Sequence, residues 1–350
     1  MSENQRRTES LPPLQEAIQG LANEMGALPS DRLNWLMQQD GVSFGGTLQE
    51  INSSTRSLNP QEHTFDGKYV VAGTIGGSFP PEQEDKVILL DTLITAAQQH
   101  IERQRQDNVD PQTILNEIAV SIPTVVNKLH LFADGNGRTS RLLRMVLRDA
   151  DLVTPTKTEA AVRSDGFDRY DATPVGPIET SIRHRMRQVN QTTEITILDD
   201  LVDPFALADE HSDEILSAYP DIDRSLIRAY HDSPNFNEAV RLLAKVEGER
   251  SISLDELFGR IAHNPQDLEA FTNAYRDVRR QEVELLIQGL MGGSPIPLII
   301  SDRISATNTH INNPRKRQGL APIDPKNLNT IQDFQMAYCE TFSPDRLRVD

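Results

Sequence analysis

The densest set of chemically useful side chains lies in residues 130–141, with the sequence HLFADGNGRTSR. The segment opens on a histidine and contains one carboxylate, a glycine-asparagine-glycine turn and two arginines three residues apart. Glycines leave the backbone N–H groups of a turn accessible because no Cβ covers them. The start of a helix adds positive electrostatic potential. The segment therefore predicts an anion site, and phosphate is the anion that suits it best.

Each charged residue of this segment has a role that its chemistry allows. Arg138 and Arg141 share one face of the first helical turn, so both guanidinium groups can grip phosphate oxygens. Asp134 beside a phosphate site needs an intervening cation, and Mg²⁺ commonly binds one carboxylate plus phosphate oxygens. His130 has an ordinary pKa of about 6.5 and can accept a proton near neutral pH. This inventory suits transfer of a phosphorus group to a hydroxyl.

The segment resembles the signature of the Fic family, HxFx(D/E)GNGRxxR, and agrees with it at every fixed position. Leu131 stands where the family usually has proline, a position that carries no chemistry. The resemblance implies the Fic fold, a mainly α-helical core in which the motif loop joins two central helices. It also implies the family's commonest activity, transfer of AMP from ATP to a Ser, Thr or Tyr hydroxyl of a target protein with release of pyrophosphate.

The same resemblance assigns a role to each matching residue. His130 would be the general base for the target hydroxyl, Phe132 would anchor the loop in the core, and Asp134 would hold Mg²⁺. The phosphates of ATP would be bound by the loop and by both arginines: Gly135, Asn136, Gly137, Arg138 and Arg141. Fic proteins that transfer other groups often differ at the acidic position or in the GNGR segment. Because Asp134 and Arg138 agree with the signature, the resemblance favours nucleotide transfer.

Residues 67–81, with the sequence GKYVVAGTIGGSFPP, differ in amino-acid composition from the helical segments around them. β-Branched and aromatic residues favour strands, and the glycines supply turns. The segment resembles the Fic flap, which pairs with a target segment by strand addition. We expect a short β-hairpin flap in which Gly73, Thr74, Ile75 and Gly76 dock the target, although an ordinary structural hairpin fits the same pattern.

Residues 46–52, GTLQEIN, resemble the inhibitory helix that many Fic proteins carry. Thr47, Glu50 and Asn52 agree with that pattern, while Gly46 and Ile51 depart from it. In such a helix the glutamate pairs with the second arginine of the motif and restrains productive ATP binding. By this resemblance Glu50 is a candidate inhibitory residue, and an ordinary exposed helix residue is the other interpretation.

Apolar spacing predicts a mainly α-helical chain in three parts. Residues 1–60 form an N-terminal helical segment, residues 61–195 the Fic domain, and residues 196–350 a helical domain whose role the motifs do not define. Two buried helices are expected on either side of the motif, the first with apolar residues from Ile114 to Leu129. Pro123 should kink that helix or begin a new one. Arg144 and Arg148 are expected to be solvated helix arginines.

Composition narrows the class of protein. The chain has 350 residues, 37% of them hydrophobic, and a formal net charge of -17, which disfavours a nucleic-acid partner. Cys339 is the single cysteine, the N-terminus lacks a secretory pattern, and the longest apolar run near the C-terminus, residues 296–300, is too short to span a bilayer. We expect no membrane association. A cytoplasmic protein and a translocated effector both fit, and the oligomeric state stays open.

Other functions fit the same residues. The site could use UTP or another phosphorylated donor, because the motif contacts phosphates and not the base, or it could remove AMP. The chain could also be a non-catalytic scaffold that recruits partners through its helical C-terminus. The intact histidine, aspartate and arginines disfavour the scaffold. A P-loop NTPase does not fit, since the sequence has no GxxxxGK(S/T) segment.

Overall fold

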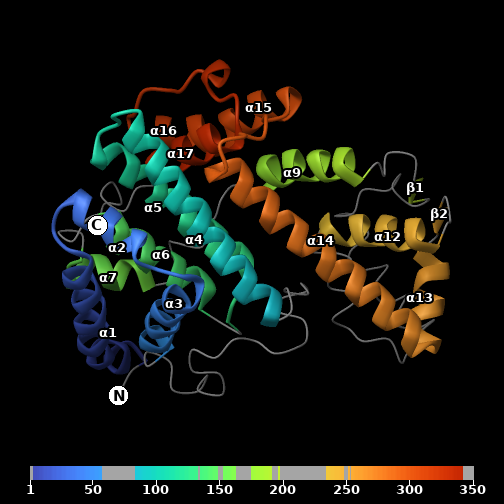
Figure 1. Ribbon diagram of the computed structural model, residues 1–350, viewed down its shortest axis with the longest axis horizontal. Coiled ribbons are helices and arrows are strands. Elements are labelled where there is room, and N and C mark those ends of the chain that lie inside the picture. Colours follow the sequence, from blue (N-terminus) through green and yellow to red (C-terminus); the bar gives the residue numbers. More distant parts are fainter. Residues whose placement is uncertain are drawn as a thin grey trace. The chain divides into compact units, whose positions relative to one another are not determined.

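The computed structural model describes residues 3–56, 83–132, 135–148, 153–162, 175–190, 196–197, 234–247, 251–252 and 254–341. This described part is mainly helical, which confirms the predicted class (Figure 1). Contacts divide the chain into two units. The first comprises Met1–Val70, Lys86–Ile182 and Val283–Asp350, and the second comprises Val71–Asp85 and Arg183–Glu282. The segment predicted as one C-terminal domain, residues 196–350, is therefore shared between the two units.

The first unit is built around two neighbouring helices, α5 (Pro111–Leu129) and α6 (Asn136–Arg148). Before them come α1 (Glu3–Met25), α2 (Pro29–Met37), α3 (Gly41–Arg56) and most of α4 (Gln83–Gln106). After them comes α7 (Pro155–Val162). The C-terminal elements of this unit are α15 (Ile300–Ala306), the π-helix η3 (Thr307–Asn312), α16 (Asn313–Arg317), the 3₁₀-helix η4 (Pro325–Asn327) and α17 (Ile331–Thr341).

The second unit contains α12 (Pro234–Glu247) and α13 (Leu254–His263), with β1 (Thr196–Ile197) paired in parallel to β2 (Ser251–Ile252). Like α4, the helices α9 (Val175–Asn190) and α14 (Pro265–Met291) have residues in both units. The apolar residues of segments 236–246, 254–261 and 283–291 lie in α12, α13 and α14. Residues 198–233, part of the predicted C-terminal helical domain, lie outside the described residues.

The sequence of α5 explains where it begins and which face it buries. Asp110 caps its first turn by accepting a hydrogen bond from the backbone N–H of Thr113 at 3.2 Å, and Pro111 occupies a first-turn position that needs no donor. The predicted apolar series is buried throughout: Ile114, Ile118, Ile122, Val125, Val126 and Leu129. Pro123 lies inside one continuous helix and does not begin a new one. Its carbonyl oxygen accepts a hydrogen bond from the Ser140 hydroxyl at 2.6 Å, which ties α5 to α6.

Helix α6 is buried on almost all sides. Helices α1, α3, α5 and α7 all contact it, and its residues from Thr139 to Leu147 are buried. Residues 3–56 form α1, α2 and α3, in which Leu33, Leu36, Leu48 and Ile51 are buried. In α4, Leu90, Leu93, Ile94 and Ala97 are buried, whereas Val87 is exposed.

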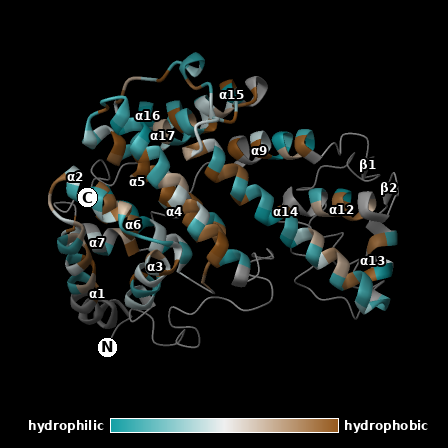
Figure 2. Ribbon diagram, in the orientation of Figure 1, coloured by the Kyte–Doolittle hydropathy of each residue, from teal (hydrophilic) through white to brown (hydrophobic). Residues whose placement is uncertain are grey.

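No helix in the described ranges is long and apolar enough to cross a bilayer. The two long helices, α4 and α14, both carry hydrophilic residues along much of their length (Figure 2).

Candidate functional site

His130 lies immediately after α5 and ends that helix. Its backbone is left-handed, with φ +47° and ψ +54°, a conformation that is uncommon for any residue other than glycine. The backbone N–H of His130 donates to the carbonyl oxygen of Asn127 at 3.3 Å. The side chain is half-buried. This helix end turns the chain abruptly and places His130 directly before the buried residues Leu131 and Phe132, where the motif loop begins.

The loop after His130 is closed by the side chain of Asn136. Its amide oxygen accepts a hydrogen bond from the backbone N–H of Phe132 at 2.9 Å, and its amide nitrogen donates to the Phe132 carbonyl at 2.7 Å. Phe132 itself is buried, as expected of a loop anchor. The Asn136 side chain therefore holds the loop together, using its amide oxygen and one of its two amide N–H donors.

Gly135 is required at its position for two reasons. Its φ of +78° is unfavourable for other residues, and its carbonyl oxygen accepts the backbone N–H of Thr139 at 2.8 Å to start α6. A Cβ at Gly135 would lie 2.8 Å from the amide nitrogen of Asn52 in α3. That same nitrogen donates to the Thr139 hydroxyl at 3.1 Å. Helix α3 thus packs directly against the loop and the first turn of α6.

The first turn of α6 contains three of the residues predicted to bind an anion, Asn136, Gly137 and Arg138. Because Thr139 makes the first backbone hydrogen bond of the helix, the N–H groups of Asn136 and Gly137 have no acceptor within it. The positive end of the helix dipole adds to their effect. Arg138 is half-buried, and its Nε lies 3.7 Å from where a Cβ of Gly135 would be. The Arg138 side chain therefore folds back over the loop, next to these N–H groups.

The side chain of Arg141 is buried, whereas that of Arg138 is half-buried. Arg141 is 6% exposed, and its Nε donates to the carbonyl oxygen of Ala161 in α7 at 2.5 Å. Arg141 therefore links α6 to α7 in this structure. Contact with a γ-phosphate would have to come from its terminal nitrogens.

The candidate inhibitory residue Glu50 lies on α3, two residues before Asn52. Its side chain is exposed, whereas Asn52 is buried against α6. Among the described residues α3 reaches the motif through Asn52, and the pairing of Glu50 with Arg141 stays a prediction.

Several predicted site residues lie outside the described ranges. Asp134 is one of them, and so are all four flap residues, Gly73, Thr74, Ile75 and Gly76. Among the described residues no group of three or more histidine, cysteine or acidic side chains could hold a metal ion. A Mg²⁺ held by Asp134 and nucleotide phosphates would need no such group, so the predicted metal site stays a prediction.

The expectation that Arg144 is a solvated helix arginine is wrong. Arg144 is 8% exposed, because helices cover α6 on several sides, and it lines a cavity together with the half-buried Arg148. One signal in the sequence could have shown this. Arg144 is flanked by Leu142, Leu143, Met145, Val146 and Leu147, a run of apolar residues too continuous for a helix with an exposed face.

Compared with known proteins, the chain matches no protein family, no curated protein and no solved structure at a significant level.

Proposed function

We propose that this chain transfers AMP from ATP to a hydroxyl group of a target protein. The observation that carries the proposal is the conformation of residues 130–132 and 135–141. A helix ends at the histidine, an asparagine side chain closes a short loop, and a new helix starts with outward N–H groups beside an arginine. The arrangement has the parts needed for phosphate binding next to a group that can accept a proton.

In the proposed reaction the target hydroxyl oxygen attacks the α-phosphorus of ATP. The bond from that phosphorus to the oxygen bridging the β-phosphate breaks, and pyrophosphate leaves. The proton of the hydroxyl passes to the imidazole of His130. The N–H groups of Asn136 and Gly137 and the side chain of Arg138 hold the phosphates in place, since they lie together at the start of α6. Mg²⁺, held by Asp134, would neutralise phosphate charge.

Three further inferences accompany the proposal, and they concern the fold, the target-docking flap and the site of action. We infer that residues 61–195 adopt a Fic-type arrangement, supported by the helix–loop–helix of α5 and α6 and by the sequence of the loop. The flap, with Gly73, Thr74, Ile75 and Gly76, would pair with a strand of the target. We also infer a cytoplasmic site of action, where ATP and Mg²⁺ are supplied.

The test is incubation of the full chain with Mg²⁺ and candidate target proteins, using ATP labelled at the α- or the γ-phosphate. We expect label on protein from the α-position and none from the γ-position, with a gain of one AMP at a hydroxyl residue by mass spectrometry. Labelling by α-labelled UTP alone would assign another donor. Loss of label from a protein that already carries AMP would assign removal, and no transfer under any condition would favour a scaffold.

A further inference from the structure

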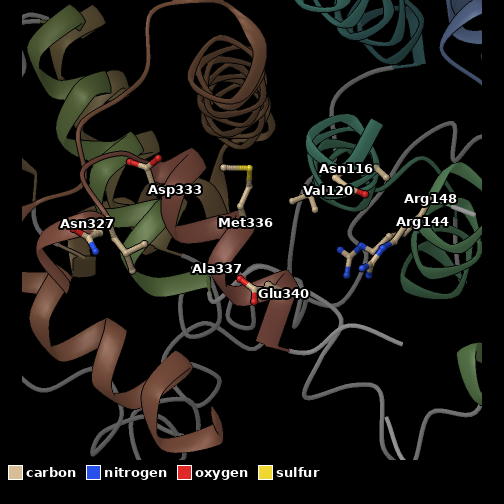
Figure 3. A pocket seen from close by; sticks show the side chains of 11 residues that line it. Asn116, Val120, Arg144, Arg148, Asn327, Asp333, Met336, Ala337 and Glu340 are labelled. Atoms are coloured by element: carbon tan, nitrogen blue, oxygen red, sulfur yellow. The ribbon is translucent and has the colours of Figure 1, made fainter. Parts of the chain in front are cut away.

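A cavity of about 440 Å³ lies in the first unit, between α5, the C-terminal half of α6, and α17 with the residues just before it. Arg144 and Arg148 come from α6, four residues apart, and so share one face of that helix. Figure 3 shows both guanidinium groups pointing into the cavity, toward Met336 and Glu340. The cavity is separate from the motif loop, since Arg144 is eight positions after Asn136, a rise of about 12 Å along the helix.

Arg144 is the feature that needs a ligand. Its side chain is more than nine-tenths buried, and its Nε has no hydrogen-bond partner within the residues that the structure describes. A buried N–H donor without a partner is costly, because it loses its hydration and gains no hydrogen bond in return.

The two carboxylates that line the cavity, Asp333 and Glu340, already have other partners. Asp333 accepts hydrogen bonds from the backbone N–H groups of Asn329 and Thr330 at 3.0 and 2.9 Å, and so caps the first turn of α17. Glu340 is half exposed and pairs with Arg315 at 3.6 Å. Neither group compensates Arg144, but both disfavour a ligand that carries several negative charges.

The remaining walls are mostly apolar. They are formed by small or flexible side chains: Ala119, Val120, Leu328, Met336 and Ala337. Methionine in particular adapts its shape to different ligands. The volume lies within the range of small-molecule sites. The cavity thus has two arginine side chains on one side and mostly aliphatic side chains on the other.

We propose that this cavity binds a small organic acid with a single carboxylate and an aliphatic body. The carboxylate would lie in the fork of the Arg144 guanidinium, with Arg148 as a second donor. The body would lie against the apolar side chains of α5 and α17. The position on α6 supports a single charge, because the C-terminal end of a helix carries negative potential that opposes a polyanion.

The first test is thermal unfolding of the full chain with hexanoate, 1-hexanol or inorganic phosphate at equal concentrations. A ligand that binds only the folded state raises the unfolding midpoint. We expect a saturable rise with hexanoate and little or none with the alcohol or with phosphate. No rise with hexanoate overturns the proposal. An equal rise with hexanol would mean that the arginines are not used, and a larger rise with phosphate would mean an inorganic anion site.

The second test changes the arginine. Arg144→Leu should abolish the response to hexanoate and leave the midpoint of the ligand-free chain unchanged or higher, since it removes an uncompensated charge. Arg317→Leu is the matched control, an exposed arginine in α16, and should keep the full response. Arg144→Lys keeps the charge but loses the fork, so its response should be weaker than that of the wild type. Circular dichroism checks that each variant is folded, and a full response in Arg144→Leu overturns the proposal.

Discussion

The two ends of α6 carry the same kind of residue in different surroundings. At the N-terminal end, Arg138 lies over a glycine loop beside outward N–H groups, and the helix dipole adds to the positive charge. At the C-terminal end, Arg144 and Arg148 face a mostly apolar cavity, and the negative end of the helix dipole stabilises these cations while offsetting part of their positive potential. The first end therefore suits a polyanion such as a triphosphate, and the second suits one carboxylate. An arginine's neighbours, more than its own charge, decide which anion it can bind.

The largest expected effect is on transfer at the N-terminal end. His130→Ala should lower the rate of AMP transfer by about 10²- to 10⁴-fold, the usual cost of losing a general base. ATP affinity should stay close to that of the wild type, because the imidazole acts on the incoming hydroxyl. The measurement is label transfer together with calorimetric titration of ATP. His184→Ala is a control, since this histidine is exposed in the second unit.

A transfer rate in His130→Ala close to that of the wild type would remove the proposed role of this residue. A large loss of ATP affinity would instead assign His130 to nucleotide binding.

The next effect concerns the glycine that starts α6. Gly135→Ala should lower the free energy of unfolding by about 1–3 kcal/mol, the range for a non-glycine residue in a strained conformation. It should also reduce transfer, because the new Cβ would lie 2.8 Å from the Asn52 amide and push α3 away from the loop. Chemical denaturation measures the first quantity and label transfer the second.

Gly46→Ala is the matched control for that substitution. Gly46 is exposed on α3, and a Cβ there would have no atom within 4 Å. This change should stabilise the chain by about 0.5–1 kcal/mol, since alanine favours a helix over glycine. Equal stability in the two variants would show that the close approach of α3 to the loop is not significant.

A smaller effect is expected from the candidate inhibitory residue. Glu50 places an exposed negative charge on α3, two residues from the Asn52 that contacts α6. Glu50→Ala should raise the rate of labelling by roughly twofold to fivefold, the size expected from an exposed charge. A pairing with Arg141 would make the rise larger. Glu16→Ala, at an exposed glutamate of α1, is the control. An unchanged rate would leave Glu50 as an ordinary surface residue.

The smallest effect concerns the start of α3. The backbone N–H of Ser43 donates to the Asp40 carboxylate at 2.7 Å and holds the pKa of Asp40 below its usual value of 3.8. A lowered pKa in the folded state means that the stabilisation is present above pH 4 and is lost as the pH falls through the folded pKa. Asp40→Ala should therefore lower the unfolding midpoint slightly at pH 7, and this difference should shrink as the pH is lowered below 3.8. A difference that does not shrink in acid would contradict this cap, and Asp107→Ala, an exposed loop aspartate, is the control.

The comparison also shows what the sequence could and could not predict. The spacing of apolar residues predicted the buried face of α5, because a helix repeats its contacts every three to four residues. The order of residues 130–141 predicts an anion site at the start of α6, and this site stays a prediction. The same order could not predict that the Asn136 side chain closes the loop or that Asn52 contacts Thr139, since both depend on tertiary contacts. Arg144 was misjudged for the same reason, because its burial depends on helices that are distant in sequence.

The most direct test of the account is the affinity for ATP in two variants measured side by side. Arg138→Ala removes a cation at the N-terminal end of α6, and Arg144→Leu removes one at the other end. Calorimetric titration with ATP and Mg²⁺ should show affinity reduced by about 10- to 100-fold in Arg138→Ala, as expected for a lost charge-assisted hydrogen bond. Arg144→Leu should stay within about twofold of the wild type, because its cavity suits a single carboxylate. A greater loss of ATP affinity in Arg144→Leu than in Arg138→Ala would contradict the account.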